Sequence, residues 1–205
     1  AQTALARERT PDEYRASLAA CERAAQRMTA LIESLLTLAR LDAGGGAAPA
    51  PCALDVIAAD TVDLLQPVAE RHEVQVTADC RPAPCTGNAG QLAQVVTNLV
   101  DNAITYTRRG GHVRVTTAST SHGVRLDVAD DGIGIAPADL PHVFERFYRA
   151  DPSRSGATNR TGLGLAIAKA IVERHGGTIE IDSRLDAGTT VRVTLPSAAP
   201  AAARA

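Results

Sequence analysis

The chain has 205 residues, a formal net charge of −2 at pH 7 and a hydrophobic content of 45%. This length fits one ordinary domain plus a smaller element, and this apolar content is typical of a globular domain. A net charge near zero gives no sign of binding to nucleic acid or to a membrane surface, and no apolar run reaches the roughly 18 residues that a membrane span needs.

The first predicted element is one long helix over residues 11–42. Pro11 suits the first helical turn, and Thr10 can cap it. Apolar or small residues then recur in alternating steps of three and four, which is a heptad pattern. These positions are Leu18, Cys21, Ala25, Met28, Ile32, Leu35 and Ala39.

A stripe this wide must be buried against other helices. It packs either on its own domain or in a helical hairpin that dimerises into a four-helix bundle. We favour the bundle, because the glycine- and proline-rich residues 44–53 are typical of a linker and residues 1–9 offer little surface to pack on.

Beyond the linker, residues 54–196 predict one α+β domain. Four helices are expected, over 54–72, 89–106, 139–149 and 163–175, with Asn88 as the cap of the second. Five strands are expected, over 74–77, 113–117, 124–128, 179–183 and 191–195. Helices mixed with strands that short turns join favour a two-layer α/β sandwich. The tail over 197–205 is mostly alanine and proline, and we expect it to be disordered.

The four cysteines are scattered at positions 21, 52, 80 and 85, with no CxxC pair. Cys80 and Cys85 leave open a zinc site or a disulfide, although a structural zinc site usually takes four ligands in tight pairs. We interpret the four as small buried thiols in a reducing cytosol.

Two asparagines are the first candidates for chemistry. Asn98 and Asn102 are four residues apart on a predicted helix and therefore share one face, which Thr105 and Tyr106 continue. An amide oxygen is a hard neutral ligand that suits Mg²⁺ bound to phosphates. The alternative is a pair of amides that simply face solvent.

Two glycine-rich motifs follow. Asp131 comes after a predicted strand, where its carboxylate can accept a hydrogen bond from an exocyclic amine while Gly132 and Gly134 let the backbone approach a base. Gly162 and Gly164 open a predicted helix, where free N–H groups and the helix dipole favour a phosphate. Ordinary turns are the alternative in both places.

Between the two motifs lies an aromatic segment over residues 143–149, which holds both phenylalanines of the chain. The polar, glycine-containing residues 150–161 follow it. An aromatic anchor followed by such a segment is typical of a mobile lid. Phe144 and Phe147 are expected in the core under either interpretation.

Taken in order, residues 94–106, 127–135, 143–149 and 161–165 resemble the four named segments of the ATP-binding domain of sensor histidine kinases. Gly188-Thr189 resembles the family's short element before the last strand, and residues 28–44 resemble the second helix of its dimerisation hairpin. The resemblance implies a Bergerat-type ATP-binding fold over 54–196 and a partial hairpin over 1–43.

The resemblance also implies roles for single residues. Asn98 and Asn102 would act on Mg²⁺ and the phosphates, with Asn102 as the metal ligand, and Asp131 would bind adenine. The implied nucleotide-binding residues are Asn98, Asn102, Tyr106, Asp131, Gly132, Ile133, Gly134, Gly162, Leu163, Gly164, Leu165 and Thr189. The implied lid residues are Phe144, Arg146, Phe147 and Arg149.

By the same resemblance the chain is the cytoplasmic kinase core of a two-component sensor. Such a core moves the γ-phosphate of Mg–ATP to a histidine and then to an aspartate of a response regulator, and it works as a homodimer. The family's acceptor resembles His-Glu-Leu-Arg-Thr-Pro. Aligning Arg9-Thr10-Pro11 on it would place Ala6 at the histidine position. Residues 1–9 are too few to form the antiparallel partner of a helix over 11–42, so we interpret Arg9-Thr10-Pro11 as the hairpin loop and expect the acceptor upstream of Ala1. No contact with nucleic acid or membrane is expected from this segment.

Related classes share the glycine motifs: type II topoisomerases, mismatch-repair ATPases, heat-shock chaperones and anti-sigma serine kinases. They typically carry a glutamate, as general base, where this chain has Asn98. A degenerate nucleotide-binding or dimerisation module is the other alternative. Thr105 stands where the family often has a basic residue, for which Arg108 or Arg109 offers a substitute, and Arg160 stands where a glycine is common.

Overall fold

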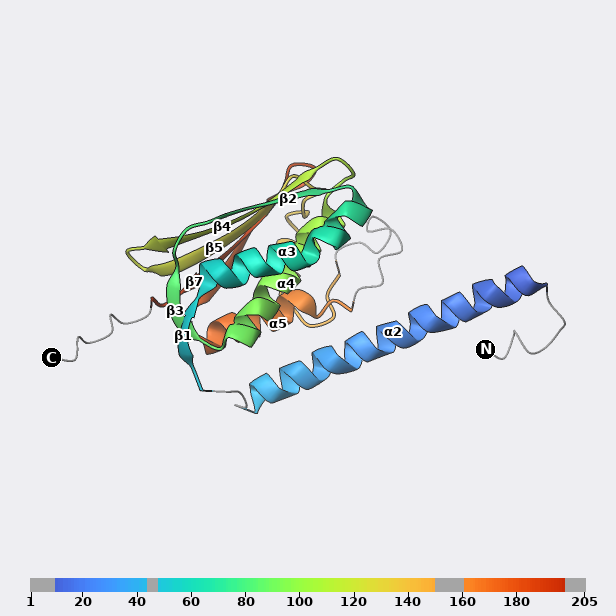
Figure 1. The fold of residues 1–205 in the computed structure, drawn as a ribbon, viewed down its shortest axis with the longest axis horizontal. Helices are drawn as coiled ribbons and strands as arrows, with labels where there is room; N and C mark the ends of the chain where they lie inside the picture. The colour runs from blue at the N-terminus through green and yellow to red at the C-terminus, as the bar shows by residue number, and fades with distance from the viewer. Residues whose placement is uncertain (1–9, 44–47, 150–160, 198–205) are drawn as a thin grey trace.

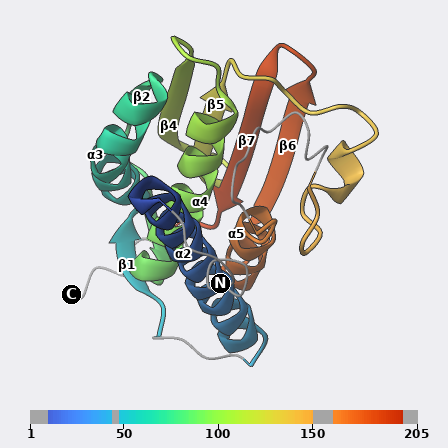
Figure 2. The ribbon, with the colours of Figure 1, turned by 90° about the vertical axis from the view of Figure 1, so that its right-hand side faces the viewer.

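A computed structural model describes residues 10–43, 48–149 and 161–197. One long helix, α2 (Pro11–Asp42), lies beside a domain built of a sheet and a layer of helices (Figure 1). In both views the helix layer lies between the sheet and α2 (Figure 2). Within the described ranges, no helix combines the length and the apolar character that crossing a bilayer requires.

Local signals at its N-terminus explain where α2 begins. The Thr10 hydroxyl accepts a hydrogen bond from the Glu13 N–H at 3.3 Å, and Glu13 Oε2 accepts one from the Thr10 N–H at 2.9 Å. This reciprocal capping box, with Pro11 in the first turn, satisfies amides that a helix start leaves unpaired. The predicted helix over 11–42 is confirmed.

Only the C-terminal end of α2 is buried against its own domain. Leu38 and Leu41 belong to the core, and Arg174 Nη1 donates to the Leu41 carbonyl at 2.9 Å. Most of the heptad stripe is open, as Leu18 at 69% and Met28 at 65% exposure show.

The main sheet has five strands in the order β2-β4-β5-β7-β6. Their bounds are β2 (Gln75–Cys80), β4 (His112–Thr120), β5 (Gly123–Asp130), β6 (Thr178–Arg184) and β7 (Gly188–Leu195). Strands β2 and β4 are parallel and the other pairs are antiparallel. Alternate residues of the central strands are buried, since successive side chains point to opposite faces of a strand.

Three helices cover the buried face of this sheet: α3 (Leu54–His72), α4 (Ala89–Tyr106) and α5 (Gly164–Arg174). Asn88 caps α4 as expected, because its side chain accepts from the Gln91 N–H at 3.0 Å. One layer of helices on one mixed sheet is the predicted α+β two-layer sandwich.

A second, two-stranded sheet was not predicted. It pairs β1 (Ala50–Ala53) with β3 (Pro84–Gly87) in antiparallel register. Residues 50–53 belong to the expected linker, so that part of the linker assignment is wrong. Strands of four residues that contain proline give no readable alternation, and their composition resembles that of a loop.

The prediction of a helix over 139–149 is also wrong. Only the single 3₁₀ turn η1 (Leu140–His142) forms there, and turns follow it. Phe147 has a positive φ of 67° and is 55% exposed, so its expected burial is wrong. Phe144 is half-buried, with Lys169 Nζ 5.7 Å from its ring centre.

Three expectations lie wholly or partly outside the described residues. They are the structure of residues 1–9, the lid over 150–161, of which only residue 161 is described, and the tail over 197–205. In the tail only Ser197 is described, and it forms a β-bridge with Cys85.

Candidate functional site

A cavity of about 1130 Å³ lies against one face of α4. Its wall continues along the loop after β5, the residues before α5, and the ends of β6 and β7. Ala30 and Ser34 of α2 and His72 of α3 also line it. Predicted site residues in the lining are Asn98, Asn102, Tyr106, Ile133, Gly134, Arg149, Gly162, Gly164, Leu165 and Thr189.

Helix α4 brings the two asparagines to this cavity because its other face is core. Val96, Val100 and Ile104 are fully buried and do not line the cavity, whereas Asn98 and Asn102 do. Asn98 Nδ2 donates to the Gly164 carbonyl at 3.1 Å. The asparagine pair and the second glycine motif are therefore neighbours in space, as the functional interpretation requires.

The first turn of α5 supplies the other side of that junction. A Cβ atom added at Gly164 would lie 3.8 Å from Asn98 Cγ and 3.9 Å from Asn102 Nδ2. No side chain of the described residues caps this helix, so its N-terminal amides and dipole can meet an anion. Leu163 is fully buried in the core and does not line the cavity, whereas Leu165 does.

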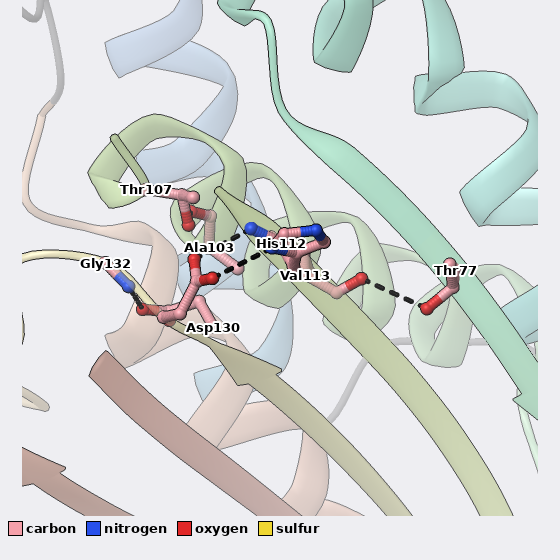
Figure 3. Close-up of polar contacts among 8 residues, drawn as sticks. Thr77, Ala103, Thr107, His112, Val113, Asp130 and Gly132 are labelled. Carbon is pink, nitrogen blue, oxygen red and sulfur yellow. Dashed lines mark hydrogen bonds and ion pairs between the residues drawn. The ribbon is translucent and has the colours of Figure 1, made fainter. Parts of the chain in front are cut away.

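Two adjacent aspartates at the end of β5 have different environments. Asp130 lines the cavity. Its Oδ1 accepts from the Gly132 N–H at 3.0 Å (Figure 3), and it also accepts from the Thr189 N–H at 3.2 Å. Asp131 does not line it. Its Oδ1 accepts from the His112 N–H at 2.7 Å, and its Oδ2 lies 3.0 Å from His112 Nδ1.

The prediction that Asp131 is the cavity's carboxylate is therefore wrong. Strand β5 runs to Asp130, two residues beyond the expected end of the strand at 128. Since neighbouring side chains alternate between faces, that extension sends Asp130 towards the cavity and Asp131 away from it.

Burial makes Asp130 an unusual acid. Desolvation raises its pKa to about 6, although the hydrogen bonds from Gly132 and Thr189 act in the opposite direction. Asp131 differs, because the hydrogen bond from the His112 N–H lowers the pKa of that exposed carboxyl. A half-buried carboxylate in mostly apolar surroundings is a strong hydrogen-bond acceptor for the exocyclic amine of a planar base.

The first glycine motif packs too closely for side chains. A Cβ atom added at Gly132 would lie 2.3 Å from the Tyr106 carbonyl oxygen. Gly134 has φ +64°, and its Cβ atom would lie 2.0 Å from the Arg184 carbonyl oxygen. Gly132 thus shapes the cavity from behind, without lining it, while Gly134 and Ile133 form its surface.

Gly134→Ala should destabilise the fold more than Gly110→Ala does. Both glycines have positive φ, but a Cβ atom at Gly110 meets nothing within 4 Å. The left-handed conformation alone costs about 1–2 kcal/mol, and the overlap at Gly134 adds about 1–3 kcal/mol. Urea denaturation of both variants measures the difference, and equal losses would contradict this account of Gly134.

The aromatic segment contributes to the cavity through other residues than expected. Arg149 lines it, but Phe144, Arg146 and Phe147 do not. Tyr148 does line it, and its hydroxyl donates to Asp139 Oδ1 at 2.6 Å. The sequence pattern favoured the two phenylalanines of this segment as functional residues, and it gave no signal that distinguished Tyr148.

Of the two basic substitutes for Thr105, only Arg108 lines the cavity, where it forms an ion pair with Asp186. Arg109 instead pairs with Glu73, at 3.3 Å. Thr105 itself lines the cavity, and its hydroxyl donates to the Asp101 carbonyl at 2.8 Å.

The cysteines do not form a zinc site. Cys80 lies in β2 of the main sheet, while Cys85 lies in β3 of the small one. Within the described residues, no group of three or more His, Cys, Asp or Glu side chains could hold a metal ion.

Comparison with known proteins agrees with this geometry. Residues 87–199 match the family described as Histidine kinase-, DNA gyrase B-, and HSP90-like ATPase. The sensor histidine kinase RppB of Synechocystis is 37% identical over 187 residues, which are 90% of this chain and 41% of RppB.

Two solved structures share the fold. The mycobacterial sensor histidine kinase MprB matches with a TM-score of 0.62 and 29% identity, over 72% of this chain and 97% of that one. Full-length ShkA, in complex with AMPPNP, matches with a TM-score of 0.76 and 27% identity, over 96% of this chain and 41% of that one.

The chain therefore belongs to this ATPase family and carries the ATP-binding domain of a sensor histidine kinase. It spans about two fifths of the length of RppB.

Proposed function

We propose that this chain is the cytoplasmic kinase core of a two-component sensor. It binds Mg–ATP in the cavity and transfers the γ-phosphate to a histidine on a dimerisation helix. The observation that carries the proposal is the juxtaposition of Asn98 and Asn102 with the uncapped start of α5, in a cavity that also contains Asp130.

The adenine end of the ligand lies at Asp130. Its Oδ1 is held by two backbone amides, which leaves Oδ2 to accept a hydrogen bond from the exocyclic amine. The phosphates lie between α4 and the start of α5, where the Asn102 amide oxygen suits the Mg²⁺ ion that they carry. When bound, that ion offsets the charge that develops on the phosphates.

The acceptor is a histidine rather than water or a hydroxyl group. Asn98 stands where related ATPases and serine kinases carry a glutamate base, and its amide cannot take up a proton. An imidazole is nucleophilic with little help from such a base.

The open stripe of α2 supports a homodimer. Leu18, Met28 and Ile32 are each more than half exposed on one helix, and an apolar stripe of this length requires a partner. We propose that two copies bury it in a four-helix bundle, and that a response-regulator receiver domain then takes the phosphoryl group.

Residues 1–205 should bind ATP but should not label themselves. Phosphoryl transfer needs a nucleophile in line with the γ-phosphate. Of the five histidines, four lie away from the cavity and His72 lies at the end of α3, none of them on the dimerisation helix.

The test is incubation with γ-labelled ATP, alone and with a separate hairpin that carries an acceptor histidine. We expect acid-labile label on the hairpin only. Label on this chain alone would contradict the assignment of its histidines, and ATP binding without transfer to any hairpin would favour the degenerate module.

A further inference from the structure

Two thiols face each other across the small sheet. Cys52 of β1 lies directly opposite Cys85 of β3 in the antiparallel register, and their sulfur atoms are 3.3 Å apart. Neither residue lines the nucleotide cavity. We propose that Cys52 and Cys85 are a redox modification site, at which a peroxide converts the two thiols into a reversible disulfide.

The strand pairing already provides the geometry of the bond. Directly opposed residues in antiparallel strands have Cα atoms about 4.5–5.5 Å apart, and disulfides span Cα separations of about 4.4–6.8 Å. The sulfur atoms are in contact, so the bond needs a small closure of two side chains and no new backbone path. Cys80 has no such neighbour, because β2 pairs with β4 in the other sheet.

The two thiols differ in their access to solvent, which gives each a separate role. Cys85 is fully buried, whereas Cys52 is half-buried at the edge of the core. Burial, together with the contact to Cys52, raises the pKa of the Cys85 thiol to about 12. An oxidant from solution therefore reaches Cys52 first, and Cys85 reacts only with a group that forms beside it.

Hydrogen peroxide is the class of oxidant that balances the reaction. The Cys52 thiol gives up its proton, the thiolate attacks one peroxide oxygen, and the O–O bond breaks. The leaving hydroxide takes up that proton, so the products are a sulfenic acid and one water molecule. The Cys85 sulfur then attacks the Cys52 sulfur, the S–O bond breaks, and the Cys85 proton leaves with the hydroxyl group as a second water. Two thiols lose two electrons and the peroxide gains them, while a dithiol reductant reverses the bond by exchange.

The location gives the disulfide a structural effect. Strand β1 directly precedes α3 and lies on the path from α2 into the domain, and β3 leads through Asn88 into α4, which carries Asn98 and Asn102 (Figure 1). The β1–β3 ladder has four residue pairs, and a two-stranded ladder of this size is marginal by itself. A disulfide across this ladder would keep β1 paired with β3, and would thereby fix the segment that joins the dimerisation helix to the nucleotide-binding domain.

The test uses the folded chain with Cys21 and Cys80 replaced by serine, so that Cys52 and Cys85 are the only thiols. After treatment with hydrogen peroxide, remaining thiols are alkylated and the protein is mapped by mass spectrometry without reduction. We expect the loss of two hydrogen atoms, one linked peptide pair with Cys52 and Cys85, and return of both thiols with dithiothreitol. Exchange of the Leu54 amide, which bonds to Ala83 beside the ladder, should slow several-fold in the oxidised form.

The matched control is Cys52→Ser in the same background, which leaves Cys85 buried and should give neither the link nor the slower exchange. Cys85→Ala repeats the control from the other strand, with circular dichroism to check that it folds. Two outcomes would overturn the proposal: both thiols still alkylated after unfolding, or Cys52 carried to sulfinic acid without a link. Since the reaction needs no nucleotide, its failure would leave the ATP-binding proposal untouched.

Discussion

Asp130→Asn should lose most of its affinity for adenine nucleotides while its fold stays at least as stable as that of the wild type at pH 8. The asparagine oxygen can still accept from the Gly132 and Thr189 amides, so the backbone of the site is preserved. In the asparagine, an NH₂ group replaces the other carboxylate oxygen. This NH₂ donor would face the exocyclic amine of adenine, which is also a donor. An unmatched buried polar group costs about 1–3 kcal/mol, or roughly a 5- to 150-fold loss of affinity in calorimetry.

The stability of the same variant has a defined pH dependence. Asp130 has a folded pKa of about 6, above its ordinary value of 3.8. Between these values the folded state binds more protons than the unfolded state, so the free energy of unfolding falls as pH rises from about 4 to about 6. Asp130→Asn lacks this loss of stability. Denaturation curves at pH 4.5 and pH 8 should therefore give free energies of unfolding that differ less for the variant than for the wild type.

Asp131→Asn is the matched control, one residue away. Asp131 contacts His112 outside the cavity, so this variant should bind ATP as the wild type does. If Asp131→Asn lost affinity and Asp130→Asn kept it, the assignment made from the sequence would be right and the one made from the structure wrong.

The two aspartates show where reasoning from the sequence stops. The motif and its strand could be predicted, but which of two neighbouring side chains faces the cavity depends on where β5 ends. That end is set by pairing with β4 and β7, through Asp130 opposite Val113 and Thr189. A shift of one residue moves a side chain to the other face, and no local pattern determines it.

Elements with strong local signals were predicted well. Helix α2 has a capping box and a heptad stripe, and α4 has Asn88 as a cap and an apolar face of helical period. Strands β1 and β3 have no local signal, because their pairing joins residues more than thirty positions apart. Residues 139–149 contain helix-favouring side chains, but contacts such as Phe147 N–H to the Gly162 carbonyl at 3.0 Å hold them in turns.

The cavity likewise combines features that a local sequence pattern predicts with features that depend on contacts between distant parts of the chain. Asn98 and Asn102 could be placed on one helix face by their spacing, yet the Asn98–Gly164 hydrogen bond joins residues 66 positions apart. Ala30, Ser34 and His72 enter the lining only because α2 and α3 pass this cavity. A family motif names residues that act together, and tertiary packing decides which neighbours complete the site.

Asn102→Ala should remove the Mg²⁺-dependent part of ATP affinity. Its amide oxygen is proposed as the one protein ligand of a metal that is otherwise held by phosphates and water. Loss of even an outer-shell partner of a metal typically costs about 10- to 100-fold in affinity, so we expect at least a roughly tenfold loss with Mg²⁺ in calorimetry. With EDTA the variant and the wild type should bind ATP equally.

Two controls on the same helix separate this role from a structural one. The Thr97 hydroxyl donates to the Ala93 carbonyl and does not line the cavity, so Thr97→Ala should change neither measurement. Asn98→Ala breaks the bond to the Gly164 carbonyl and should lower affinity with and without Mg²⁺, because the start of α5 loses its anchor on α4. Equal losses for Asn102→Ala in Mg²⁺ and in EDTA would show that Asn102 shapes the cavity and does not bind the metal.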